Sequence, residues 1–250
     1  MTYCLAIKVN DGLVFASDSR TNAGVDQLST YSKMFTFGIE GERALVLLTA
    51  GNLATTQGVV SQMKRDIREQ TESNLQTFQD IEEAAEYVGQ ISQSQQRKHV
   101  NAAAGNAVDT SATFIFGGQI GDRPPKIFMI YPEGNFIAST DETPYQQIGE
   151  AKYGKPVLDR IIRKKTGLKE AATCALVSMD STMQSNATVG PPIEVLLYQR
   201  DALRFDKHVS FQADNPYLIE LKQAWDNEIK DAFDNLSRYD WENVVSVEVD

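Results

Sequence analysis

The sequence predicts an α+β fold in which two antiparallel β-sheets stack face to face and helices cover both outer faces. The first observation behind this prediction is the order of the elements, because two groups of strand-like segments are each followed by a pair of helical segments. The second is the run "LVLLTA" at residues 45–50, since an almost unbroken apolar run is typical of a strand buried on both faces. No linker, low-complexity tract or internal repeat divides the 250 residues, so we expect a single domain over residues 1–250.

The N-terminal part of the chain is predicted to consist mostly of strands. Residues 3–9 and 13–17 are short apolar segments, and the strong turn signal Asn10-Asp11-Gly12 between them predicts a β-hairpin. The polar stretch at residues 21–30 is predicted to be a loop. The two apolar segments after it, at residues 32–38 and 43–51, are predicted to be strands.

Helical spacing of apolar side chains marks the remaining helices, and turn residues separate the remaining strands. The first helical pair is marked by Val59, Val60, Met63 and Ile67, and by Ile81, Ala84, Ala85, Val88 and Ile91. Strands follow at residues 111–119, 126–134 and 135–140. The second helical pair is marked by Val157, Leu158, Ile161 and Ile162, and by Ala171, Ala172, Ala175, Leu176 and Met179. A pair of strands follows at residues 193–199 and 204–211, and a last amphipathic helix at residues 217–233.

The charge balance argues against two classes of partner. Lys plus Arg number 24 and Asp plus Glu number 34, which gives a net charge of −10. Nucleic acids and anionic membranes both attract positive charge, so neither is expected as a partner. No apolar stretch approaches the roughly 20 residues of a membrane span, and the N-terminus lacks the pattern of a signal peptide. We therefore expect a cytoplasmic protein.

Cysteine and histidine are both scarce. Cys4 and Cys174 are too few for a disulfide framework or a metal site, and we expect no metal and no cofactor. The only histidines are His99 and His208, so a histidine-based triad is not expected and an enzyme of this sequence needs another base. Asn186-Ala187-Thr188 fits the glycosylation pattern, which we interpret as a chance match in a chain without a signal peptide.

Thr2 is the first candidate for chemistry. Methionine is normally removed when the second residue is small, and removal of Met1 exposes the α-amine of Thr2. An α-amine has a pKa of about 7.7–8.0 and can act as a base near neutral pH. A threonine hydroxyl needs such a base to become a nucleophile, so Thr2 can carry both groups in one residue. Considered alone, Thr2 can equally be a small residue that only permits this trimming.

Asp18 and Lys33 strengthen the case for Thr2. The predicted hairpin brings Asp18 back alongside Thr2, and Lys33 lies at the start of the next strand. A lysine near the Thr2 hydroxyl would lower the pKa of that hydroxyl, and a carboxylate would hold the lysine charged and in place. Considered singly, both residues are ordinary surface charges at strand ends, but with Thr2 they form a set with defined roles.

This set resembles the N-terminal nucleophile hydrolases of the proteasome β type, in which an aspartate and a lysine follow the N-terminal threonine at the same spacing. "LLTAGNLATTQ" resembles the family's strand-to-helix corner, where the amide of a glycine at the position of Gly51 forms the oxyanion hole. "SMDSTMQSN" resembles the later loop whose aspartate, matching Asp180, supports the active site, and its spacing is similar to that of the HslV branch. The similarity is greatest to the bacterial Anbu (ancestral β subunit) group, in which "MTYCLAI", "YSKMF" and "SMDSTM" recur.

The resemblance implies a four-layer αββα sandwich and an enzyme that hydrolyses amide bonds. It implies Thr2 as nucleophile and amine base, Lys33 and Asp18 as its supporting pair, and the Gly51 N–H as the oxyanion donor. It also implies a ring or spiral homo-oligomer, whereas an ATPase partner would leave no trace in this chain. Two alternatives stay open: a catalytically silent assembly subunit, and a hydrolase of small amides that does not cleave proteins.

The sequence departs from the family pattern at two places. Many proteasome-type subunits carry a serine in the segment matching "QIGEAKYG", where Glu150 stands here. A carboxylate there either accepts the proton of the α-ammonium group or repels the substrate. The serine expected three residues after the supporting aspartate is replaced by Met183, and both Ser181 and Ser185 are candidates to substitute for it.

The resemblance also indicates which residues line the substrate pocket, because they follow Asp18 and Gly51 in this family. Those residues are Arg20, Thr21, Asn22, Asn52, Leu53 and Thr56. Their polar character favours a small polar pocket for a peptide or a related amide. Arg20 can equally have a structural role, paired with a neighbouring carboxylate.

Overall fold

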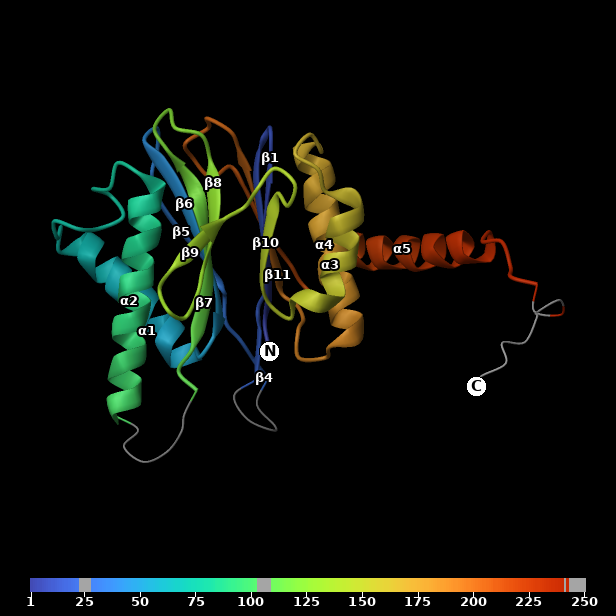
Figure 1. The fold of residues 1–250 in the computed structure, drawn as a ribbon, viewed down its shortest axis with the longest axis horizontal. Helices are drawn as coiled ribbons and strands as arrows, with labels where there is room; N and C mark the ends of the chain where they lie inside the picture. Colours follow the sequence, from blue (N-terminus) through green and yellow to red (C-terminus); the bar gives the residue numbers. More distant parts are fainter. Residues whose placement is uncertain (23–27, 103–108, 241, 243–250) are drawn as a thin grey trace, which may run out of the picture.

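Two five-stranded antiparallel sheets form the centre of the molecule (Figure 1). The computed structural model describes residues 1–22, 28–102, 109–240 and 242. The first sheet has the order β10-β1-β2-β11-β12, with β1 at Tyr3–Val9, β2 at Gly12–Asp18, β10 at Tyr145–Gly149, β11 at Ile193–Gln199 and β12 at Lys207–Phe211. The second has the order β5-β6-β7-β8-β9, with β5 at Met34–Ile39, β6 at Arg43–Gly51, β7 at Ala112–Ile120, β8 at Lys126–Ile130 and β9 at Phe136–Ala138.

Two pairs of helices cover the outer faces of the sheets (Figure 1). The second sheet is covered by α1 (Leu53–Arg68) and α2 (Ile81–Ala102), and the first by α3 (Ala151–Ile161) and α4 (Leu168–Ser185). The predicted α+β fold with four αββα layers is therefore confirmed.

Three apolar layers hold the four structural layers together. One lies between the two sheets, and each of the others lies between a sheet and its helices. In β1, Tyr3, Leu5 and Ile7 contribute to the layer under α3 and α4, whereas Cys4 and Ala6 face the second sheet. Because side chains alternate between the two faces of a strand, a strand between two such layers is apolar throughout. This explains the nearly unbroken apolar runs in the sequence.

Three short strands were not predicted. The expected polar loop at residues 21–30 overlaps β3 (Arg20–Asn22) and contains β4 (Leu28–Thr30), and these two strands pair with each other. Strand β10 pairs with β1 at the edge of the first sheet, in a register that sets Gly149 opposite Tyr3. Within β10 only Tyr145 and Ile148 are buried, so the segment lacks the alternation that identifies a strand.

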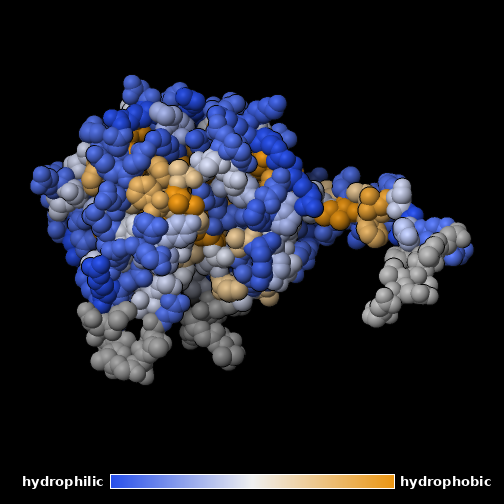
Figure 2. Space-filling model, viewed as in Figure 1, coloured by the Kyte–Doolittle hydropathy of each residue, from blue (hydrophilic) through white to orange (hydrophobic). Residues whose placement is uncertain are grey.

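Helix α5 (Pro216–Asp234) confirms the predicted last amphipathic helix, but it projects away from the sandwich (Figure 1). Its first turn is capped by Asn215, whose side chain accepts hydrogen bonds from the backbone N–H of Tyr217 and Leu218. None of its residues is fully buried, and hydrophobic side chains are visible along it in Figure 2. Of the helices in the described ranges, none combines the length and the apolar character needed to cross a membrane.

Candidate active site

The β1–β2 hairpin brings the N-terminus and Asp18 together. The turn at Asn10-Asp11 sets a register in which Cys4 lies opposite Ser17. The next position along each strand joins Tyr3 to Asp18, and the backbone N–H of Tyr3 donates to Asp18 Oδ1 at 3.0 Å. Thr2 is therefore one residue from a direct contact with Asp18, as the predicted hairpin requires.

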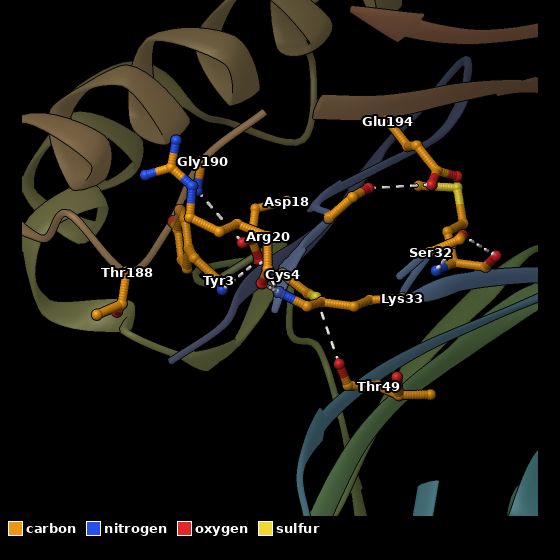
Figure 3. A network of polar contacts seen from close by, with 12 residues as sticks. Tyr3, Cys4, Asp18, Arg20, Ser32, Lys33, Thr49, Thr188, Gly190 and Glu194 are labelled. Carbon is orange, nitrogen blue, oxygen red and sulfur yellow. Dashed lines mark hydrogen bonds and ion pairs between the residues drawn. The ribbon is translucent and has the colours of Figure 1, made fainter. Parts of the chain in front are cut away.

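Asp18 and Lys33 form a buried ion pair (Figure 3). Lys33 Nζ lies 2.7 Å from Asp18 Oδ1 and also donates to the carbonyl oxygen of Arg20 at 2.7 Å. Asp18 is 0% exposed and Lys33 5% exposed. Burial raises the pKa of the Asp18 carboxyl, while the charge of Lys33 and the hydrogen bonds from Lys33, Tyr3 and Gly190 act in the opposite direction. A buried pair needs such additional hydrogen bonds to offset the loss of water.

The backbone of Thr2 is fixed by the segment that follows β10. The N–H of Glu150 donates to the carbonyl oxygen of Thr2 at 2.8 Å. Gly149 permits this approach, because its φ is +81° and a Cβ at that position would lie 1.9 Å from the Thr2 oxygen. Met1 is 62% exposed, so the residue that must be removed lies in solvent.

Gly51 ends β6 at the same end of the sandwich. Two residues earlier, the N–H of Thr49 donates to the carbonyl of Lys33 at 3.0 Å. The carbonyl of Thr49 accepts a hydrogen bond from Cys4 Sγ at 3.6 Å. These contacts tie the end of β6 to Lys33 and to β1. Gly51 is exposed and has a φ of +106°, and a side chain there would meet the carbonyl oxygen of Ser111. The chain thus bends at Gly51 as it leaves the sheet and enters α1.

Two of the predicted substrate residues have their polar groups engaged within the protein. Arg20 Nη1 donates to the carbonyl of Ala187 at 2.6 Å, so among the described residues Arg20 pairs with the backbone and not with a carboxylate. The side chain of Asn52 caps α1 by accepting from the N–H of Thr55 at 3.1 Å, and its amide donates to the carbonyl of Asp109.

Thr21 differs from these two, because its hydroxyl oxygen is buried and has no hydrogen-bond partner among the described residues. The side chain of Asn22 lies outside the described part of the structure. Leu53 and Thr56 lie in the first turns of α1, where Leu53 is 38% exposed and Thr56 is buried.

Residues 178–185 of the expected supporting loop are instead the last part of α4, so the prediction of a loop there is wrong. Ser178 faces the first sheet and hydrogen-bonds Tyr3 OH at 2.7 Å. Asp180, two residues on, points elsewhere because successive helical residues are turned by about 100°. Its Oδ1 lies 3.8 Å from Lys222 Nζ of α5, and burial raises the pKa of its carboxyl.

Ser181 and Ser185, the two candidates to replace the expected serine at position 183, do not hydrogen-bond to the described residues of the Thr2 set either. Ser181 Oγ donates to the carbonyl of Val177 within α4 at 2.9 Å. Ser185 is exposed at the last residue of the helix. Among the described residues, Asp180, Ser181 and Ser185 therefore make no hydrogen bond or ion pair with Thr2, Asp18 or Lys33.

Residues 186–190, directly after α4, hold the site in a way the sequence did not predict. Asn186 Nδ2 donates to Glu150 Oε2 at 2.6 Å, and the N–H of Gly190 donates to Asp18 Oδ2 at 3.3 Å. Asn186 Oδ1 accepts from the N–H and the hydroxyl of Thr188 at 3.0 and 2.6 Å. The Asn186-Ala187-Thr188 sequence could have indicated this turn. The same pattern that fits a glycosylation site also favours a turn closed by the asparagine side chain.

A second polar cluster lies beside the ion pair (Figure 3). Ser19 Oγ donates to Glu194 Oε1 at 3.2 Å, and His208 Nε2 lies 3.4 Å from Glu194 Oε2. Burial opposes ionisation of Glu194, but hydrogen bonds from His208, Ser32 and Ser19 outweigh it and lower the pKa of that carboxyl. His208 therefore pairs with Glu194 and not with a residue of the Thr2 set.

Comparison with known proteins gives consistent matches over most of the chain. Residues 2–197, which include Thr2, Asp18 and Lys33, match the family described as Proteasome subunit. Anbu from Yersinia bercovieri is 41% identical with a TM-score of 0.88, covering 96% of this chain and 99% of that chain. A structure of the helical assembly of the Anbu complex from Pseudomonas aeruginosa is 42% identical with a TM-score of 0.91, covering 97% and 100%. A proteasome subunit beta from Haloquadratum walsbyi is 23% identical over 215 residues, which is 84% of this chain and 79% of the relative.

Proposed function

Because this chain belongs to the proteasome subunit family, and within it to the Anbu group, we propose that it is an amide-bond hydrolase whose nucleophile is Thr2. The observation that carries the proposal is the buried Lys33–Asp18 ion pair at the end of the hairpin that begins beside Thr2. A buried cation held by a carboxylate and a carbonyl oxygen is a fixed positive charge, and such a charge favours ionisation of a nearby hydroxyl.

The proposed reaction starts with removal of Met1, which frees the α-amine of Thr2. The amine accepts the proton of the Thr2 hydroxyl while Oγ attacks the carbonyl carbon of the substrate amide. The N–H of Gly51 stabilises the resulting oxyanion, a contribution of typically about 2.7–4 kcal/mol. The C–N bond then breaks, the leaving amine takes up the proton, and an ester remains on Oγ. Water hydrolyses this ester, which releases a carboxylic acid and regenerates Thr2.

The substrate that fits this reaction is a peptide or a related amide. Arg20, Thr21, Asn22 and Asn52 follow Asp18 and Gly51 in the chain, and we propose that they border the substrate site.

The proposal is tested by intact-mass measurement after treatment with a β-lactone, a reagent that acylates N-terminal threonine nucleophiles. We expect a protein that lacks Met1 and gains one acyl group, which peptide mapping locates at Thr2. A protein that retains Met1 and forms no adduct would contradict the proposal and favour the silent assembly subunit.

We also propose that the protein self-associates through α5. The first part of the helix's apolar stripe, Leu218, Leu221 and Trp225, packs against the apolar layer under α3 and α4. The stripe continues at helical spacing through Ile229 and Phe233, which are 49% and 58% exposed. Exposed apolar stripes of this kind indicate protein–protein contact. The Anbu relative from Pseudomonas aeruginosa forms a helical assembly, which supports a second copy of this chain as the partner.

Replacing Phe233 with glutamate is therefore expected to shift the protein to smaller particles, because it places a charge at the exposed end of the apolar stripe. Sedimentation velocity at matched concentrations measures the change. Gln223→Glu adds the same charge on another face of α5 and is expected to leave the particle size unchanged. An unchanged distribution for Phe233→Glu would rule out α5 as the contact surface.

A further inference from the structure

A second carboxylate, that of Glu150, lies close to Thr2. The N–H of Glu150 donates to the carbonyl oxygen of Thr2 at 2.8 Å, so their main chains are one hydrogen bond apart. The positive φ of Gly149 brings the chain this close. Any charged group on the backbone nitrogen of Thr2 would therefore form in the immediate neighbourhood of Glu150.

The Glu150 carboxylate is largely dehydrated and lacks a close cation. Its side chain is 12% exposed, and Oε2 accepts from Asn186 Nδ2 at 2.6 Å. Oε1 lies 3.9 Å from Nζ of Lys152, a lysine whose side chain is 67% exposed. Among the described residues no other cation lies within ion-pair distance of Glu150. A largely buried carboxylate with so distant a cation partner can accept a second positive group.

Asp18 is the other carboxylate close to Thr2, but its oxygens already accept hydrogen bonds from other groups. They accept from Lys33 Nζ at 2.7 Å, from the N–H of Tyr3 at 3.0 Å and from the N–H of Gly190 at 3.3 Å. Its charge is balanced by Lys33. Glu150 is thus the carboxylate beside Thr2 whose cation partner among the described residues is the distant and exposed Lys152.

Asn186 fixes where the Glu150 carboxylate lies. Its Oδ1 accepts two hydrogen bonds from Thr188, which determines the orientation of the amide and directs Nδ2 toward Glu150. Its own backbone N–H donates to the carbonyl of Thr182 at the end of α4. The carboxylate is therefore held from a rigid helix end and not from a free loop.

We propose that Glu150 binds the α-ammonium group that removal of Met1 creates on Thr2, and that Asn186 is a positioning residue that holds the carboxylate for this contact. The inference rests on the proposed function, because it assigns a partner to the amine that acts as the base there. A carboxylate stabilises the protonated amine, so it moves the release of its proton to higher pH. The other charged groups around the amine are Asp18 with its partner Lys33, and Lys152 beside Glu150.

The test measures the titration of the Thr2 α-amine in the full chain lacking Met1. Competitive acetylation with acetic anhydride at a series of pH values, read by mass spectrometry of the N-terminal peptide, gives the midpoint. We expect Glu150→Gln to lower the midpoint by about one pH unit relative to the wild type. Asn186→Ala is expected to lower it by less, in the same direction. The control Glu142→Gln removes an exposed carboxylate from the loop before β10 and is expected to leave it unchanged.

A midpoint in Glu150→Gln that equals the wild-type value would overturn the inference, and Asn186→Ala provides the second reading should Glu150→Gln fail to fold. The result is separable from the proposed function. Acetylation reports on the amine whether or not the hydroxyl is reactive, whereas β-lactone labelling reports on the hydroxyl. A shifted midpoint without lactone labelling would leave the Glu150 contact intact and remove the hydrolase.

Discussion

Replacing Thr2 with alanine is expected to lower both amide hydrolysis and β-lactone labelling by about 10⁴-fold or more. Alanine has no hydroxyl, so no ester can form, although Met1 is still removed before so small a residue. The hydrogen bond that fixes Thr2 uses its backbone carbonyl, and its side chain is only partly buried. We therefore expect the thermal unfolding midpoint of Thr2→Ala to match the wild type. Intact mass after lactone treatment and a thermal melt measure the two expectations.

Thr2→Ser is the matched control for this variant. Serine keeps the hydroxyl and permits the same trimming, so the adduct is expected to persist at a reduced rate. Full labelling of Thr2→Ala would show that the reagent reacts elsewhere, and the assignment of Thr2 as nucleophile would then be wrong.

The part of the site that could be predicted from the sequence is the part built by local structure. The Asn10-Asp11-Gly12 turn fixes the register of β1 and β2, and that register alone sets Asp18 beside the N-terminus. Successive side chains of a strand point to opposite faces of the sheet, so a strand that is apolar throughout must be buried on both faces. The apolar runs in the sequence therefore predicted two buried sheets. Lys33 directly precedes β5 of the other sheet, and its place beside Asp18 was predicted only from the set of residue types and the family resemblance.

The parts that could not be predicted depend on how elements pack. Asp180 lies in the matched motif, yet the rotation of α4 about its own axis directs Ser178, not Asp180, toward β1. Asp180 was assigned from the motif resemblance, whereas the apolar layer between α4 and the sheet sets that rotation. Asn186 was overlooked for a related reason. A turn-forming Asn-x-Thr sequence occurs in many loops, and only the approach of Glu150 gives it a role here.

Breaking the Lys33–Asp18 pair from one side is expected to lower the free energy of unfolding by about 3–5 kcal/mol. Asp18→Asn keeps the size of the side chain but leaves the buried Lys33 ammonium without a counter-charge. Lys33→Met removes the cation and leaves the fully buried Asp18 carboxylate alone. Lys33→Met removes the positive charge, and Asp18→Asn removes the carboxylate that holds this charge in place. The rate of lactone acylation is therefore expected to fall by about 10²-fold or more in both variants. Urea denaturation and labelling kinetics measure the two effects.

The double variant Asp18→Asn/Lys33→Met separates the structural role of the pair from its chemical role. With neither charge left unpaired, part of the lost stability is expected to return, and the two substitutions should be strongly non-additive. Acylation is not expected to return, because the cation is absent. Asp141→Asn, which breaks the exposed pair with Lys164, serves as the control and is expected to change neither quantity. Additive losses of stability would mean that the two residues are not a coupled pair, and a double variant that acylates at the wild-type rate would remove Lys33 from the mechanism.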